Sequence, residues 1–178
     1  MLSKQKDGME TEVRKKLFTV QDYCRMARAG ILRPEDRVEL IDGEIIEMSP
    51  IDYRHAVCVS RMTTLLSFCA SRVLIFTQRK DPFPAEEVLL TVEVSDASLS
   101  KDQTIKLPKY SEARISEYWV ADLQNNILYI YRNPNGETYD TILTFHPGDS
   151  VSVLAFPDIT FRVDELLSTD CEIPVDEL

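Results

Sequence analysis

Residues 87–95, EVLLTVEVS, form an apolar and largely β-branched run that is interrupted by one carboxylate, Glu93. This composition is typical of a strand buried in a sheet. Alternation along the strand places Glu93 and Ser95 on one face and Val92 and Val94 on the other. An ionised carboxylate in such a setting is costly unless it is paired, hydrogen-bonded or bound to a metal. The sequence therefore predicts that Glu93 has a charged or polar partner.

Residues 98–113 follow this strand and are predicted to form a helix with Ser98 or Ser100 as its N-cap. Pro108 within this span predicts a kink or a late start. Three side chains of the helix are predicted to face inward: Ile105, Tyr110 and Ala113.

Lys106 lies on this helix, thirteen positions after Glu93, with Asp102 one turn before it. A helix that packs back on its preceding strand can bring Lys106 toward the end of that strand. Phosphodiester hydrolysis needs a divalent cation held by oxygen ligands, an activated water and a positive group near the developing charge. Glu93 could be the ligand and Lys106 the positive group. The alternative is a salt-bridged Glu93 at a sheet edge and a solvated Lys106.

The remaining sequence predicts further helices and strands. They are a helix at 19–31 with Thr19 as N-cap, a hairpin around Asp42-Gly43, a helix at 54–71, a short strand at 73–78, three strands over 116–145, and one or two strands with a terminal helical turn over 148–167. This order predicts an α+β or mixed α/β class, with a central sheet flanked by helices. One domain is expected over 18–168, after a disordered lead-in at 1–17 and before a tail at 169–178.

Composition narrows the class of function. The net charge of −10 argues against tight, non-specific binding of nucleic acid, because such binders usually carry a basic patch. It is compatible with an enzyme whose acidic site recruits a divalent cation. The four cysteines are scattered and do not have the spacing of metal ligands. The N-terminal residues do not resemble a secretory signal, so we expect the cysteines to be free thiols in a reducing cytoplasm. No apolar run approaches membrane-spanning length, so no membrane association is expected.

Five blocks follow one another between residues 18 and 167: FTVQDYCRMARAGIL, RVELIDGEIIEMSPI, RHAVCVSRMTTLL, VLLTVEVSDASLSKDQTIKLPKYSEARISEYWVAD and ILYIYRNP. Together they resemble the Uma-two family of restriction-endonuclease-like proteins, which is abundant in cyanobacteria. The family is similar to the PD-(D/E)XK nucleases, in which a mixed sheet lies between helices. The resemblance therefore implies a restriction-endonuclease-like fold and hydrolysis of DNA phosphodiester bonds with Mg²⁺ or Mn²⁺.

The resemblance also implies roles for individual residues. Glu93 in VEVS matches the second metal ligand of the family's site. Ser95 stands where the E-x-K motif has its lysine, and Lys106 in DQTIKLPKY matches a lysine that has moved to the following helix. Glu39 in VELIDGE matches an upstream glutamate. The implied catalytic residues are thus Glu93, Lys106 and Glu39, with Glu93 and Glu39 as metal ligands.

The chain departs from the family's pattern at the proline-linked aspartate. The short strand at 73–78 runs almost directly into a turn-rich segment, which leaves no place for the strand that carries this residue. Pro157-Asp158 has the right letters but lies near the C-terminus, where a strand-entry turn is predicted. His55 is predicted to be a structural residue at a helix start.

The missing aspartate and the acidic charge support a second reading. In that reading, the chain is a catalytically silent binding or assembly module that keeps the nuclease fold. Pairing through an open edge of the C-terminal strands would produce a homodimer.

Overall fold

The computed structural model describes residues 14–67 and 85–170. The predicted strand at 73–78, most of the predicted lead-in and most of the predicted tail lie outside the described residues. The chain divides into two compact units, with the boundary between Ser49 and Pro50. No helix in the described ranges is both long enough and apolar enough to cross a membrane.

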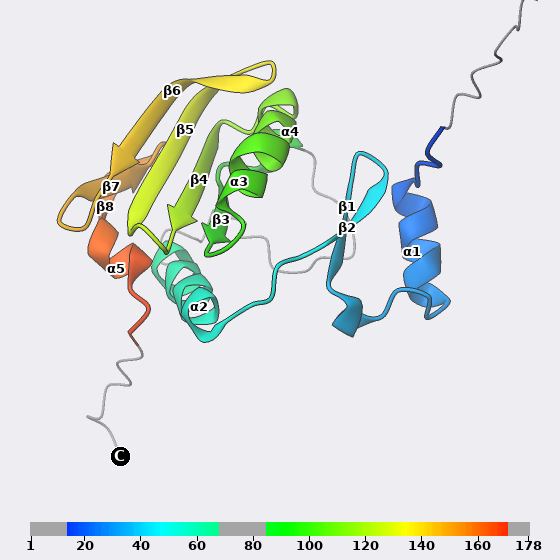
Figure 1. The fold of residues 1–178 in the computed structure, drawn as a ribbon. Helices are drawn as coiled ribbons and strands as arrows, with labels where there is room; N and C mark the ends of the chain where they lie inside the picture. Colours follow the sequence, from blue (N-terminus) through cyan, green and yellow to red (C-terminus); the bar gives the residue numbers. More distant parts are fainter. Residues whose placement is uncertain (1–13, 68–84, 171–178) are drawn as a thin grey trace, which may run out of the picture. The chain divides into compact units, whose positions relative to one another are not determined.

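The first unit consists of α1 (Val20–Arg28), η1 (Pro34–Asp36), β1 (Val38–Ile41) and β2 (Glu44–Glu47) (Figure 1). Thr19 caps α1 as predicted: its hydroxyl accepts a hydrogen bond from the Asp22 backbone N–H at 3.1 Å. The hairpin turns at Asp42-Gly43, where both residues have positive φ. A Cβ on Gly43 would lie 2.8 Å from the Cβ of Leu17, so the turn requires glycine for space as well as for conformation.

The second unit begins with α2 (Tyr53–Ser67) and η2 (Ala85–Glu87). It continues with β3 (Thr91–Ser95), α3 (Leu99–Lys101), η3 (Asp102–Lys106), α4 (Leu107–Glu112), β4 (Glu117–Asp122), β5 (Ile127–Asn135), β6 (Thr138–Phe145), β7 (Ser150–Val153), β8 (Phe156–Arg162) and α5 (Val163–Leu167). Strands β3, β4, β5 and β6 form one sheet in that order, and β7 pairs with β8. The β3–β4 pair is parallel and the β4–β5 and β5–β6 pairs are antiparallel, so the sheet is mixed. The parallel pair requires a crossover connection, which the helical segment between β3 and β4 supplies. The predicted fold class is confirmed.

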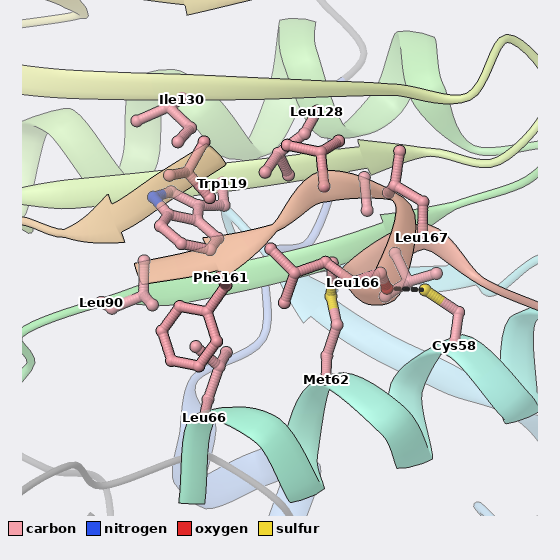
Figure 2. Packing of buried hydrophobic residues seen from close by; sticks show 14 of the residues in the cluster. Cys58, Met62, Leu66, Leu90, Trp119, Leu128, Ile130, Phe161, Leu166 and Leu167 are labelled. Carbon is pink, nitrogen blue, oxygen red and sulfur yellow. Dashed lines mark hydrogen bonds between the residues drawn. The ribbon is translucent and has the colours of Figure 1, made fainter. Parts of the chain in front are cut away.

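One face of this sheet carries the larger hydrophobic core. Trp119, Leu128 and Ile130 project from β4 and β5 and are fully buried. Figure 2 shows them facing Met62 and Leu66 of α2, together with Phe161 of β8 and Leu166 of α5. Helices α2 and α5 and the β7–β8 hairpin therefore cover this face. The prediction that Trp119 serves core packing is confirmed.

The opposite face carries a second, aromatic core. Tyr118, Tyr131 and Tyr139 lie on three neighbouring strands, with successive ring centroids 5.7 and 6.0 Å apart. Leu107 of α4 packs against them. Because side chains alternate along β3, Glu93 and Ser95 belong to this face, while Val92 and Val94 join the larger core. The crossover helix between β3 and β4 thus covers the face that holds the candidate site.

This crossover helix contains one π-turn, η3, which ends two residues before Pro108. The Leu107 N–H donates to the carbonyl oxygen of Asp102, five residues earlier. The longer turn shifts the inward face, so the buried residues are Asp102, Leu107 and Ser111.

Two sequence predictions on this helix are wrong for that reason: Ile105 and Ala113 are exposed. Tyr110 does pack inward, with its ring centroid 4.8 Å from that of Tyr118. Ser98 is at the N-cap position but makes no side-chain capping bond.

The thiol of Cys58 is expected to be unreactive in the folded protein. Cys58 is fully buried, its Sγ donates to the Leu166 carbonyl oxygen at 3.3 Å, and burial raises its pKa to about 12. Cys24 is exposed. Iodoacetamide at pH 8 should therefore modify Cys24 but modify Cys58 only after unfolding in urea. Peptide mass spectrometry measures both rates, and equal rates in the folded protein would contradict the expectation.

Candidate active site

Glu93 lies in the middle of β3, opposite Val120 in the register with β4. Its side chain is 23% exposed, so the carboxylate is neither sealed in the core nor fully solvated. β3 stands at one end of the described sheet order. The helix that follows β3 folds back over this face and brings polar groups to both carboxylate oxygens.

Lys106 is the charged partner of Glu93. Its Nζ lies 3.1 Å from Oε2 of Glu93, and its side chain is only 14% exposed. The lysine belongs to the π-turn η3, a type of helix distortion that recurs at functional sites. The structure thus brings together the two residues that the sequence pairs across thirteen positions. Their chemical roles remain predictions.

Asp102 is a second carboxylate beside the same ammonium. Its Oδ1 lies 3.3 Å from Lys106 Nζ, and its side chain is 1% exposed. Its Oδ2 accepts hydrogen bonds from the hydroxyls of Ser95 at 2.5 Å and Ser98 at 2.7 Å. No role for Asp102 was predicted from the sequence. Its spacing of four residues from Lys106 was the available signal, because such pairs meet on one side of a helix.

Tyr110 fixes the other oxygen of Glu93. Its hydroxyl donates to Oε1 at 2.7 Å, so a tyrosine and a lysine from one helix hold the two oxygens of Glu93. Beneath it, Tyr118 is fully buried and donates to the Asp102 carbonyl oxygen at 3.3 Å. Burial raises the pKa of the Tyr118 hydroxyl well above its usual range, and the nearby carboxylates of Glu93 and Asp102 raise it further. Tyr118 therefore remains a hydrogen-bond donor.

The carboxylate oxygens of Glu93 are of the type that hard divalent cations take as ligands. Mg²⁺ prefers oxygen ligands and is often held by one or two carboxylates and several waters. Glu93 is the more exposed carboxylate of the cluster, whereas Asp102 is almost fully buried. Within residues 14–67 and 85–170, no group of three or more His, Cys, Asp or Glu side chains is arranged to hold a metal ion. A role for Glu93 as one ligand of such a cation remains a prediction.

Three other residues were singled out in the sequence. Glu39 is a half-buried residue of β1, opposite Ile46. Because it belongs to the first unit and Glu93 to the second, its part in a shared site remains a prediction. The His55 N–H donates to Asp52 Oδ1 at 2.8 Å at the start of α2, which agrees with the predicted structural position. Asp158 is exposed within β8, so the predicted turn at this position is wrong.

The fold of the chain has a counterpart among solved structures. A solved structure with the same fold is that of a "putative nuclease belonging to DUF820" from Anabaena variabilis ATCC 29413. The two share 15% sequence identity with a TM-score of 0.56, over 85% of this chain and 98% of that chain. At this identity, the likeness concerns the fold alone.

The family can be stated more narrowly. Residues 68–164 match the model of the Uma2 family, described as "Putative restriction endonuclease", over more than half of the 178 residues. The chain belongs to this family, and the resemblance inferred from the sequence is confirmed. A search of curated proteins found no match.

Proposed function

We propose that the protein is a metal-dependent endonuclease that hydrolyses phosphodiester bonds in DNA. The observation that carries this proposal is the 3.1 Å contact between Lys106 Nζ and Glu93 Oε2. A carboxylate on a sheet and a lysine beside it are the two elements that the E-x-K motif supplies, and here the lysine comes from the following helix. Membership in a family described as "Putative restriction endonuclease" supports the same chemistry.

Each residue has a distinct task in this proposal. Glu93 would hold Mg²⁺ or Mn²⁺, while the part of Glu39 as an accessory carboxylate and second ligand stays a prediction from the family resemblance. The bound cation would supply an activated water and offset negative charge on the phosphate. Lys106 presents a partly buried ammonium to the phosphoryl oxygens, where positive charge stabilises the transition state. Tyr110 orients the Glu93 carboxylate through its hydroxyl.

The net charge of −10 bears on how DNA is bound. An acidic protein repels a polyanion over the Debye length, which is about 10 Å at 0.1 M salt and about 30 Å at 0.01 M. A divalent cation held by Glu93 would offset this repulsion locally. DNA binding should therefore be weak without Mg²⁺ or Mn²⁺ and should increase when either is added.

Replacing Lys106 by Met is expected to lower the rate of DNA cleavage by a factor of about 10² to 10³, a typical cost of removing one transition-state stabiliser. The measurement is nicking of supercoiled plasmid DNA by the whole chain in Mn²⁺. The matched control is Lys109→Met, which removes a lysine that is 40% exposed and paired with Glu112 on the same helix. Lys106→Met should retain Mn²⁺ binding. An equal loss of binding and rate would remove Lys106 from the role of catalytic cation.

A catalytically silent module with the same fold is the competing function. It is favoured by the engagement of both Glu93 oxygens, one by Tyr110 and one by Lys106. The same assay separates the two functions. A folded wild-type protein that nicks no DNA in either Mg²⁺ or Mn²⁺, and gives no calorimetric heat with Mn²⁺, would be a silent module.

A further inference from the structure

We propose that Asp102 is a positioning residue that holds Lys106 when a divalent cation takes Glu93. This inference rests on the proposed function, because it requires Glu93 to be a metal ligand. It assigns a role to a carboxylate that is not itself expected to reach the cation or the DNA. The geometry that carries it is one ammonium between two carboxylates of unequal exposure.

Lys106 Nζ lies almost midway between its partners, 3.1 Å from Glu93 Oε2 and 3.3 Å from Asp102 Oδ1. A cation that enters from solvent meets Glu93, which is 23% exposed, before Asp102, which is 1% exposed. The ammonium and the cation repel each other and cannot both contact Oε2 closely. Lys106 is therefore a competitor for the proposed metal ligand and must move away from Oε2 when the cation binds.

Asp102 is built to receive the displaced ammonium. Two hydroxyls, from Ser95 and Ser98, hold its Oδ2 and fix the orientation of the carboxylate. Its Oδ1 is buried and accepts no hydrogen bond within the described part of the chain, so it faces Lys106 with its charge uncompensated by other donors. Burial prevents water from weakening this attraction. Lys106 can thus leave Glu93 without leaving the site.

The test is the affinity for Mn²⁺ alone, measured by calorimetry on the whole chain. Asp102→Asn keeps the shape of the side chain but removes its charge, so Lys106 loses one of the two carboxylates described beside it and keeps its contact with Glu93. Mn²⁺ binding should weaken about tenfold, a typical coupling between contacting charged groups. Adding Lys106→Met to Asp102→Asn removes the competing ammonium and should restore the affinity. A residue that only supports the fold would not give this recovery.

The controls separate the inference from the proposed function. Glu112→Gln removes an exposed carboxylate from the Lys109 pair and should leave Mn²⁺ affinity unchanged. If Glu93→Gln abolishes Mn²⁺ binding while Asp102→Asn leaves it unchanged, Asp102 has no positioning role and the proposed function survives. If Mn²⁺ binding is insensitive to Glu93→Gln, both are overturned.

Asp102 is buried, and a second variant covers the case in which Asp102→Asn does not fold. Lys106→Met alone removes the competitor and leaves Asp102 in place. Mn²⁺ should then bind several-fold more tightly than in the wild type. Unchanged or weaker binding to folded Lys106→Met, with circular dichroism as the check of folding, would overturn the competition on which the role of Asp102 depends.

Discussion

Replacing Glu93 by Gln is expected to abolish DNA cleavage and the binding of Mn²⁺ at this site while leaving the protein folded. Glutamine has nearly the same shape and can still accept the hydrogen bond from Tyr110. It lacks the negative charge that a divalent cation requires. Lys106 keeps Asp102 as its partner, so the loss in folding free energy should be about 1 kcal/mol.

Nicking of supercoiled plasmid DNA and calorimetry with Mn²⁺ provide the two measurements for Glu93→Gln. Circular dichroism and urea unfolding show whether the fold is retained. Glu112→Gln is the matched control, because Glu112 also pairs with a lysine but is 46% exposed on the outside of α4. Cleavage that persists in Glu93→Gln would end the assignment of Glu93 as the metal ligand.

Local sequence signals were sufficient where neighbours in the chain determine the structure. The capping residue Thr19 and the turn at Asp42-Gly43 were predicted because each acts within a few residues of itself. The strands over 116–145 were predicted from turn residues between apolar runs. The contact between Lys106 and Glu93 required one further step, the packing of a helix on its preceding strand.

Other features depend on groups that meet only after folding. The π-turn shifts the inward face of the crossover helix, which is why Ile105 is exposed and Asp102 is buried. An ideal helical period does not contain such a shift. The environment of Asp102 also includes the hydroxyl of Ser95, which comes from β3 and could not be placed there by helical spacing. The sequence showed Ser95 as a departure from E-x-K, whereas in the structure its hydroxyl donates to Asp102, the carboxylate beside Lys106.

A second buried carboxylate, Glu117, lies on the other face of the sheet, where its ion pair and hydrogen bonds hold parts of the fold together. Its side chain is fully buried and its Oε1 lies 2.7 Å from a guanidinium nitrogen of Arg132. The same oxygen accepts from the Trp119 indole N–H at 2.9 Å, while Oε2 accepts from the Leu154 backbone N–H at 2.6 Å. Arg132 also donates to the Ser152 carbonyl oxygen. Glu117 and Arg132 thereby attach the β7–β8 hairpin to the sheet.

Replacing Glu117 by Ala is therefore expected to lower the free energy of unfolding by about 3 to 5 kcal/mol, because it leaves a largely buried Arg132 without its counter-charge. Urea unfolding measures the loss, and Glu137→Ala, at an exposed turn residue, should change stability by less than about 0.5 kcal/mol. The double replacement Glu117→Leu with Arg132→Met removes both charges and should be less destabilising than Glu117→Ala. A single-variant loss below about 1 kcal/mol would show that the pair contributes little. Because Glu117 faces away from Glu93, the folded fraction of each variant should keep its affinity for Mn²⁺.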